Sequence, residues 1–307
     1  MDEHKPVLVD EVLAALAVQQ DGLYVDATFG RGGHSARILA SLGAGGRLIA
    51  IDRDPEAIAA GRQRFASEPR VALVPGAFGD LAALVHAAAG TRRCNGILLD
   101  CGVSSPQLDT PERGFSFQTD GPLDMRMDPQ HGEPAALWLA RAAHHEIRDV
   151  IARLGEEKFA RRIADAIVRA RSAAPLTRTL QLADVVARAV PTREPGKHPA
   201  TRTFQALRMF VNDELGQLRA ALTQALSLLA PQGRLAVISF HSLEDAVVRD
   251  FMRDHSSVPP ELARLPSLPP DAEPPLRLIG RKQRASEAEV AANPRARSAL
   301  LRVAERR

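Results

Sequence analysis

Short apolar runs alternate with helical stretches over the first hundred residues of the chain. The apolar runs span residues 23–27, 47–52, 71–76 and 96–100, and the stretches between them carry apolar side chains at helical spacing. This alternation predicts βαβ units, in which parallel strands are joined by right-handed helical crossovers. A long helical stretch at 214–233 leads into a further buried strand at 234–240. We therefore expect an α/β fold with a doubly wound, mostly parallel sheet.

The end of the chain and its middle depart from this alternation. The runs 276–280 and 299–305 are short and apolar, and we interpret them as closing edge strands. Residues 112–208 lack strand-like alternation, and the stretch 156–172 has apolar side chains at i, i+4, i+7, i+8 and i+11, as expected for an amphipathic helix. We predict a sheet domain formed by 1–111 and 209–307, with 112–208 inserted as an all-α subdomain. The proline-rich stretch 256–277 predicts a loop or an extended segment.

Charge is unevenly distributed along the 307 residues. The net charge is +3, but residues 141–208 hold 14 Lys and Arg against 7 Asp and Glu, and residues 277–307 hold 9 against 3. The rest of the chain is therefore acidic. Clustered cations favour a polyanionic partner such as nucleic acid, whereas solvated helix faces would give the same composition.

Composition also bears on the cellular compartment in which the protein is expected. Two cysteines, Cys94 and Cys101, without a CxxC pattern indicate neither a disulfide framework nor a zinc site. No apolar run is long enough for a transmembrane helix, and the first residues lack the apolar core of a signal peptide. We expect a reduced, cytoplasmic protein with no membrane partner.

A glycine loop follows the first predicted strand, in the sequence VDATFGRGGHS at 25–35. Glycines allow a ligand to approach the backbone, and the free N–H groups of a helix start favour polar or anionic ligands. The spacing Gly30, Gly32, Gly33 is neither the dinucleotide fingerprint nor a P-loop. By itself the loop is also compatible with a plain strand–helix turn.

Asp52 ends the second predicted strand, about twenty residues after the glycine loop. An acid at this place in a doubly wound sheet hydrogen-bonds the hydroxyls of a ribose. Asp54 precedes Pro55 and is the better candidate for the helix N-cap. The order of strand, glycine loop, helix, strand and acid predicts a nucleoside cofactor, and both NAD and S-adenosyl-L-methionine satisfy it.

Asp100 ends the fourth predicted strand and is followed by a loop of small residues up to Pro106. In amino-methyltransferases the equivalent loop carries a polar residue, two prolines and an aromatic residue. The run Ser105-Pro106-Gln107 matches this pattern in part. Such a loop holds both N–H groups of an aryl amine, so that its lone pair points at the methyl donor.

Two further segments are candidates for the site or for the core. Phe115 and Phe117 could stack on a flipped base, although paired phenylalanines are more often core residues. His241 leaves the strand at 234–240, and Ser242 with Asp245 resembles a helix-capping arrangement.

Several long runs together resemble one family. The runs ATFGRGGHS, AIDRDP, GVSSPQLD, DGPLDMRMD, HPATRTFQALR and ISFHSLED are similar to those of the bacterial ribosomal small-subunit methyltransferase H family, also called MraW. The resemblance extends from Pro6 to the C-terminus. It implies methyl transfer from S-adenosyl-L-methionine to the N4 amine of a cytidine in the decoding region of 16S rRNA, within an assembled or nearly assembled small subunit. It also favours S-adenosyl-L-methionine over NAD.

The family's cofactor contacts fall on seven positions of this sequence, which are Gly32, Gly33, His34, Asp52, Phe78, Asp100 and Gln107. For catalysis we expect in-line transfer to a neutral amine oriented by Asp100, Ser104 and Ser105, with the two cysteines as bystanders and no metal. A nicotinamide-dependent oxidoreductase and a non-catalytic RNA-binding assembly factor are the alternatives. The sequence leaves the oligomeric state open, including a homodimer.

Overall fold

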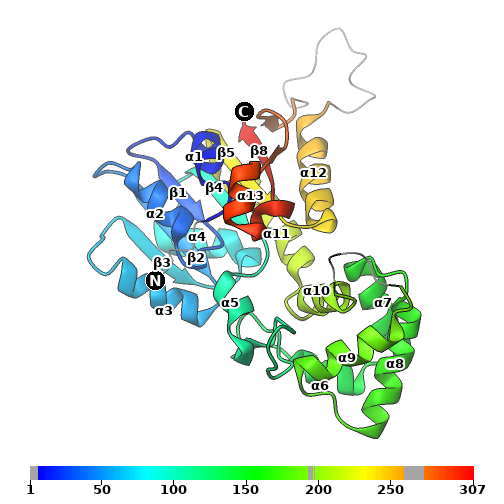
Figure 1. Ribbon diagram of the computed structural model, residues 1–307. Helices are drawn as coiled ribbons and strands as arrows, with labels where there is room; N and C mark the ends of the chain where they lie inside the picture. Colours follow the sequence, from blue (N-terminus) through cyan, green and yellow to red (C-terminus); the bar gives the residue numbers. More distant parts are fainter. Residues whose placement is uncertain (1–5, 193–195, 197, 259–272) are drawn as a thin grey trace. The chain divides into compact units, whose positions relative to one another are not determined.

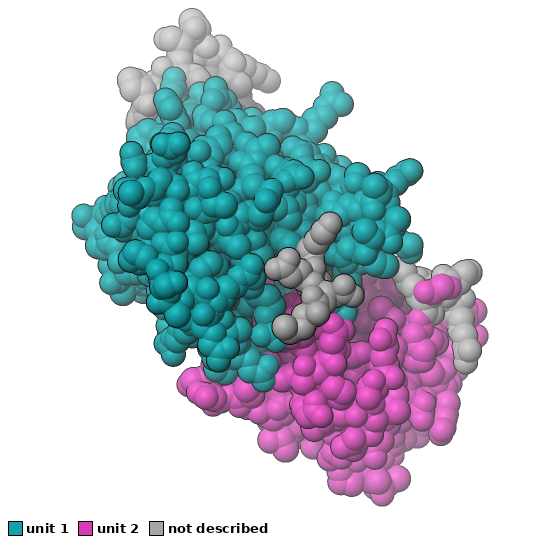
Figure 2. All heavy atoms as spheres, turned by 60° about the vertical axis from the view of Figure 1, so that its left-hand side comes forward, with its two compact units in different colours: residues 1–102, 215–307 teal, residues 103–214 magenta. Residues whose placement is uncertain are grey.

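The computed structural model describes residues 6–192, 196, 198–258 and 273–307, which fall into two compact units. The first comprises residues 1–102 and 215–307, and the second comprises residues 103–214 (Figure 2). The second unit is thus wider than the 112–208 expected from the helical texture. Most of the predicted proline-rich segment 256–277 lies outside the described residues.

The first unit is built on one mixed sheet (Figure 1). Its strands run in the order β3-β2-β1-β4-β5-β8-β6, and β7 also pairs with β8. The first five strands in this order are parallel, and β8 is antiparallel to its neighbours. The strands are β1 (Leu23–Asp26), β2 (Arg47–Asp52), β3 (Val71–Pro75), β4 (Cys94–Asp100), β5 (Leu229–Ser239), β6 (Leu276–Leu278), β7 (Gln283–Arg284) and β8 (Leu300–Arg306).

The expected doubly wound, mostly parallel α/β fold is therefore confirmed, with two corrections. The run at 299–305 is not an edge strand, because β8 pairs with β5 on one side and with β6 and β7 on the other. The long helix ends at Leu228 rather than near Pro231. The strand β5 begins directly afterwards, and a register shift opposite Cys94 and Gly96 accommodates Pro231 and Gly233.

Alternating side chains of the parallel strands face two helical layers, as the period-two geometry of a strand requires. Leu48, Leu98 and Ile238 share one apolar cluster with α1 and α2, whereas Ile49, Leu99 and Val237 share the other with α4, α11 and α12. The helices of this unit are α1 (Val9–Leu16), α2 (Gly33–Ala40), α3 (Pro55–Arg64), α4 (Leu81–Ala89), α11 (Glu214–Leu228, whose first residue is assigned to the second unit), α12 (Ser242–Ser256) and α13 (Glu287–Ala292).

Among its described residues the second unit consists of helices and irregular segments, and its β-structure is one isolated bridge between Pro122 and Arg178. Its apolar core is shared by the helices α6 to α10, and Phe115 belongs to it with only 5% of its surface exposed. The helices are α5 (Ser105–Asp109), α6 (Ala135–Arg141), α7 (His144–Gly155), α8 (Ala160–Ala173), α9 (Thr179–Ala189) and α10 (Thr201–Val211).

The run DGPLDMRMD is held by buried polar groups in place of regular secondary structure. Asn212 accepts from the backbone N–H of Met127 at 2.8 Å and donates to the carbonyl of Met125 at 2.7 Å. The guanidinium of Arg113 donates to the carbonyl of Met127 at 2.7 Å. These bonds satisfy backbone groups that would otherwise be buried without partners. The run therefore has a structural role inside the second unit.

No helix among the described residues combines the length and the apolar character needed to cross a membrane.

Candidate active site

Five parallel strands end at one edge of the sheet, and the candidate cofactor residues of the first unit lie at or after the ends of β1 to β4. β1 lies between β2 and β4, and the chain order reverses at this point. In open α/β sheets, ligands bind outside the carboxyl ends of the strands at such a reversal. Asp26, Asp52 and Asp100 are the last residues of β1, β2 and β4. Three carboxylates are thus brought to this edge.

The glycine loop follows Asp26 and leads into α2. Gly30 and Gly32 have positive φ angles of 55° and 72°, which side chains other than glycine rarely adopt. A Cβ atom on Gly32 would also lie 2.5 Å from the Phe29 ring. The loop therefore turns tightly, and α2 begins at Gly33 with its first N–H groups at the sheet edge.

Asp26 anchors this loop. Its side chain is only 1% exposed, and its two oxygens accept from the Ser35 hydroxyl at 2.7 Å and from the Thr28 N–H at 3.2 Å. Burial raises the pKa of Asp26, while the charge of His34 and the Ser35 hydroxyl act in the opposite direction. Because its oxygens bond within the loop, Asp26 shapes the site. No role was predicted for Asp26 from the sequence, although its place four residues before Gly30 is a signal.

Asp52 connects the glycine loop to the end of β2. One carboxylate oxygen accepts from the Gly30 N–H at 2.7 Å, and the other accepts from the Asp54 N–H at 2.8 Å. Burial raises the pKa of Asp52 to about 6, although both hydrogen bonds lower it. Asp54 caps α3 by accepting from the Glu56 N–H, which confirms its predicted role. Asp52 is therefore free of the capping role and lies at the end of β2, the place predicted for a ribose acceptor.

His34 and Asp100 face each other across the reversal point. The Nε2 atom of His34 lies 3.5 Å from an Asp100 carboxylate oxygen, and the histidine side chain is 6% exposed. Burial lowers the pKa of His34, but the nearby Asp100 carboxylate, with the charges of Asp26 and Glu289, outweighs it and raises the pKa. Within the described residues, His34 Nε2 and Asp100 Oδ1 are buried without a hydrogen-bond partner. Unpaired buried polar atoms are costly, so these two fit a polar ligand at this edge.

Phe78 lies at the same edge, after β3. Gly76 donates its N–H to the carbonyl of Asp52 at 2.9 Å, and Phe78 follows two residues later as the first residue of a short 3-10 turn. Its ring is partly buried against the α4 side of the core. An aromatic face at this edge of the sheet suits a nucleobase.

Ser104, Ser105 and Gln107 belong to the second unit, four to seven residues beyond Asp100. Ser104 precedes α5, and its N–H donates to the side-chain carbonyl of Gln107 at 3.0 Å. The carbonyl of Ser104 accepts from the N–H of Leu108 at 3.3 Å. Gln107 is 5% exposed. These bonds form a helix-capping arrangement that fixes the start of α5.

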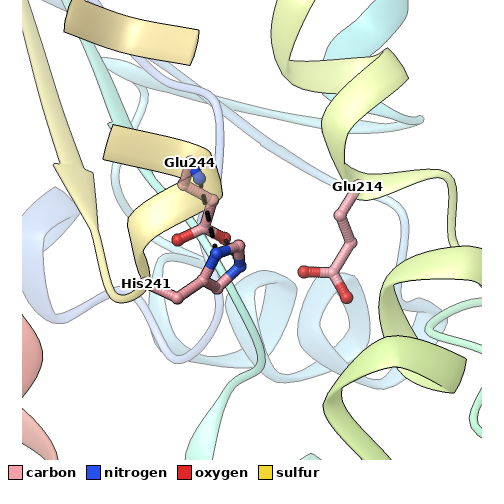
Figure 3. A group of neighbouring side chains, drawn as sticks. All are labelled: Glu214, His241 and Glu244. Carbon is pink, nitrogen blue, oxygen red and sulfur yellow. Dashed lines mark hydrogen bonds and ion pairs between the residues drawn. The ribbon is translucent and has the colours of Figure 1, made fainter. Parts of the chain in front are cut away.

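His241 leaves the end of β5, the strand next to β4. Its Nδ1 accepts from the Glu244 N–H at 3.4 Å, so His241 is the N-cap of α12 (Figure 3). The predicted capping pair of Ser242 and Asp245 is wrong in this respect, because Ser242 is already the first helical residue and Asp245 pairs with Arg302 at 2.7 Å.

The carboxylates drawn in Figure 3 have partners within the protein. Glu244 lies 3.0 Å from His241 Nε2 and accepts from the Phe240 N–H at 2.8 Å. Glu214, the first residue of α11, accepts two hydrogen bonds from Arg208 at 2.7 and 2.9 Å. Carboxylate and imidazole groups can bind cations, but the guanidinium already neutralises Glu214. We assign no metal to these side chains.

This edge has the features of a nucleoside-binding α/β enzyme, and comparison with known proteins identifies its family. The sequence profile of the MraW methylase family matches residues 1–307. The chain therefore belongs to the MraW methylase family.

Its relatives are similar over nearly their whole length. The chain is 58% identical to the ribosomal RNA small subunit methyltransferase H of Thioalkalivibrio sulfidiphilus, over 99% of this chain and 97% of the relative. It is 56% identical to the protein of the same name from Dechloromonas aromatica, over 99% and 98%. It is also similar to the solved structure of a putative rRNA-methylase from Clostridium thermocellum, at 12% identity over 99% of each chain with a TM-score of 0.46.

The raised pKa of Asp52 predicts a specific pH dependence of stability. Between about pH 4 and pH 6 the folded protein holds a proton on Asp52 that the unfolded chain releases, because its pKa is raised from 3.8 to about 6. The wild type should therefore gain unfolding free energy relative to Asp52→Asn as the pH falls through this range. We expect about 1–2 kcal/mol after allowing for partial exposure. Urea unfolding of both proteins across this range measures the difference, and an identical pH dependence would contradict it.

Proposed function

We propose that this protein transfers a methyl group from S-adenosyl-L-methionine to small-subunit ribosomal RNA, at the N4 amine of a cytidine in the decoding region. The proposal rests on one observation, the set of polar groups that meet at the sheet edge of a chain belonging to the MraW methylase family. This edge brings together Asp52, the glycine loop, and the atoms of His34 and Asp100 that are buried without a hydrogen bond. Family membership favours this cofactor over NAD, which the spacing of the glycines left open.

The residues of this edge fit the proposed cofactor. The N–H groups of Gly33 and His34 suit its polar end, since they open α2, whereas Gly32 shapes the turn before them by donating its own N–H to the Phe29 carbonyl. Asp52 would accept from the ribose hydroxyls, and Phe78 would lie against the adenine. Asp100 completes this set in the first unit, and Gln107 is the contact expected from the second. S-Adenosyl-L-methionine supplies an electrophilic methyl group when bound.

The chemical task of the protein is to activate a weak nucleophile. The lone pair of an aryl amine is delocalised into the ring, so acceptors must hold both N–H groups as the nitrogen pyramidalises. We assign this orienting role to Asp100 and to the loop at Ser104 and Ser105. A bond forms between N4 and the methyl carbon, the sulfur–carbon bond breaks, and the nitrogen loses one proton to water or a carboxylate.

The setting of the reaction is part of the proposal. We place the substrate cytidine in an assembled or nearly assembled small subunit in the cytoplasm, and we assign recognition of this substrate to the helical insert. The 14 Lys and Arg against 7 Asp and Glu at residues 141–208 support an RNA-facing role. Association as a homodimer is compatible with the proposal.

The decisive experiment maps modified nucleotides of 16S rRNA by mass spectrometry, in cells with and without this protein. One N4-methylated cytidine in the decoding region should lose its methyl group when the protein is absent. The purified protein should then transfer labelled methyl groups onto small subunits that lack this modification, and so restore the N4-methylated cytidine. An unchanged modification map would refute the assigned activity.

Replacing Asp52 by Ala should weaken the binding of S-adenosyl-L-methionine. The variant loses acceptors worth about 1–3 kcal/mol, which corresponds to a roughly 5- to 150-fold rise in Kd. Isothermal titration calorimetry measures the change. Asp10→Ala is the matched control, because it also removes one carboxylate, from a side chain that is 89% exposed. Equal affinities for the wild type and Asp52→Ala would argue against the ribose assignment.

Replacing Cys101 by Ala or Ser should leave turnover close to the wild-type rate. Direct transfer needs no thiolate, and burial raises the pKa of the other cysteine, Cys94, to about 12, which keeps it protonated at neutral pH. Methyl-transfer rates on small subunits, compared with cofactor affinity for the same variants, provide the test. Loss of turnover with normal cofactor binding would instead indicate a covalent step through Cys101.

A further inference from the structure

A groove of about 450 Å³ runs between α8 and α9 in the second unit. Its floor is made of small apolar side chains. Three arginines and one aspartate form the rest of its lining, which contains no aromatic residue. The floor residues are Ala166, Ala170, Val185 and Ala189. Arg162 and Arg169 come from α8, and Arg188 comes from α9. A floor of small side chains lets an extended chain approach the helices closely.

The three arginines of the groove differ from most other arginines of this unit. Arg141 forms an ion pair with Glu133 and Arg178 forms one with Asp120, both at 2.6 Å, and each carboxylate neutralises the charge of its arginine. Within the described part of the chain, Arg162, Arg169 and Arg188 have neither a carboxylate nor a carbonyl partner, and all three are exposed. Their guanidinium groups are therefore available to an external anion.

The single acidic residue of the groove is already engaged. Asp165 lies 2.8 Å from the Nε2 atom of His144, at the start of α7. It therefore does not neutralise an arginine of the groove, and the lining keeps an excess of positive charge. Arg162 and Arg169 are seven residues apart on one helix, about 10 Å along its axis. That separation suits successive anionic groups of a polymer better than one small ion.

We propose that this α8–α9 groove binds the sugar–phosphate backbone of small-subunit rRNA, an inference that rests on the proposed function for the identity of the RNA. Guanidinium groups match phosphate oxygens with two parallel hydrogen bonds. Contacts of this kind position an RNA and carry no sequence information. The groove therefore contributes affinity and orientation, and the choice of the cytidine is made elsewhere.

The test compares two triple variants that remove the same charge. The groove variant is Arg162→Gln, Arg169→Gln and Arg188→Gln. The control variant is Arg141→Gln, Arg148→Gln and Arg153→Gln, whose arginines have partners within the second unit. Thermal unfolding and calorimetry with S-adenosyl-L-methionine establish that both variants are folded. Binding to small subunits and to protein-free 16S rRNA is then measured over a range of salt concentrations.

The groove variant should bind both RNA targets at least about tenfold more weakly at low salt. The slope of log affinity against log salt should become shallower by about 2, as expected for three lost contacts to single-stranded RNA. Its KM for small subunits should rise while kcat at saturation stays unchanged, and the control should resemble the wild type. Equal losses in both variants would mean a general charge effect and overturn the proposal. Weakening for subunits alone would point to a protein contact and would also overturn it.

Methyl transfer by the wild type, measured in parallel, separates this inference from the proposed function. If the wild type methylates small subunits and the groove variant binds RNA normally, only the groove assignment fails. If the wild type transfers no methyl group and the groove variant still loses RNA binding, the groove stands and the proposed reaction fails.

Discussion

The hydrogen bond from the Gly30 N–H to Asp52, 2.7 Å long, is the contact on which the candidate site depends most. It ties the turn after β1 to the end of β2, so the glycine loop and the proposed ribose acceptor are positioned together. The same carboxylate is held at its other oxygen by Asp54. Both bonds favour the ionised form, yet burial still raises the pKa of Asp52 to about 6. The protein therefore maintains this carboxylate at a cost to its own stability, which is common at sites shaped for a ligand.

The same edge shows a division between structural and available polar groups. The carboxylate oxygens of Asp26 accept hydrogen bonds from Ser35 and Thr28, and these bonds hold the glycine loop. Within the described residues, His34 Nε2 and Asp100 Oδ1 are buried without a hydrogen bond, and His34 Nε2 has only its 3.5 Å ion pair with Asp100. Since a buried polar atom without a hydrogen bond costs free energy, this contrast distinguishes atoms available to a ligand more clearly than residue type does. The second unit repeats the pattern with arginines, which are paired around Glu133 and Asp120 and available along the α8–α9 groove.

Several motif residues have structural duties that their resemblance to a family does not reveal. Gln107 accepts from the N–H of Ser104 and thereby fixes the start of α5. His241 caps α12, and Asn212 holds the run DGPLDMRMD through Met125 and Met127. Phe117 packs against Phe204 with ring centroids 4.8 Å apart, which is the core role anticipated for it. A long shared motif therefore combines chemistry with the packing that supports it.

The sequence alone determined the α/β class and the parallel strands at 47–52 and 71–76, and it predicted a nucleoside at the Asp52 edge. These features follow from local periodicity and from the order of residues along the chain. Only the tertiary structure decided that β8 lies inside the sheet, that His241 rather than Ser242 is the cap, and that Asp26 anchors the glycine loop. It also distinguished paired arginines from available ones. Each of these depends on neighbours distant in the chain, and a one-dimensional pattern does not specify which side chains meet in space.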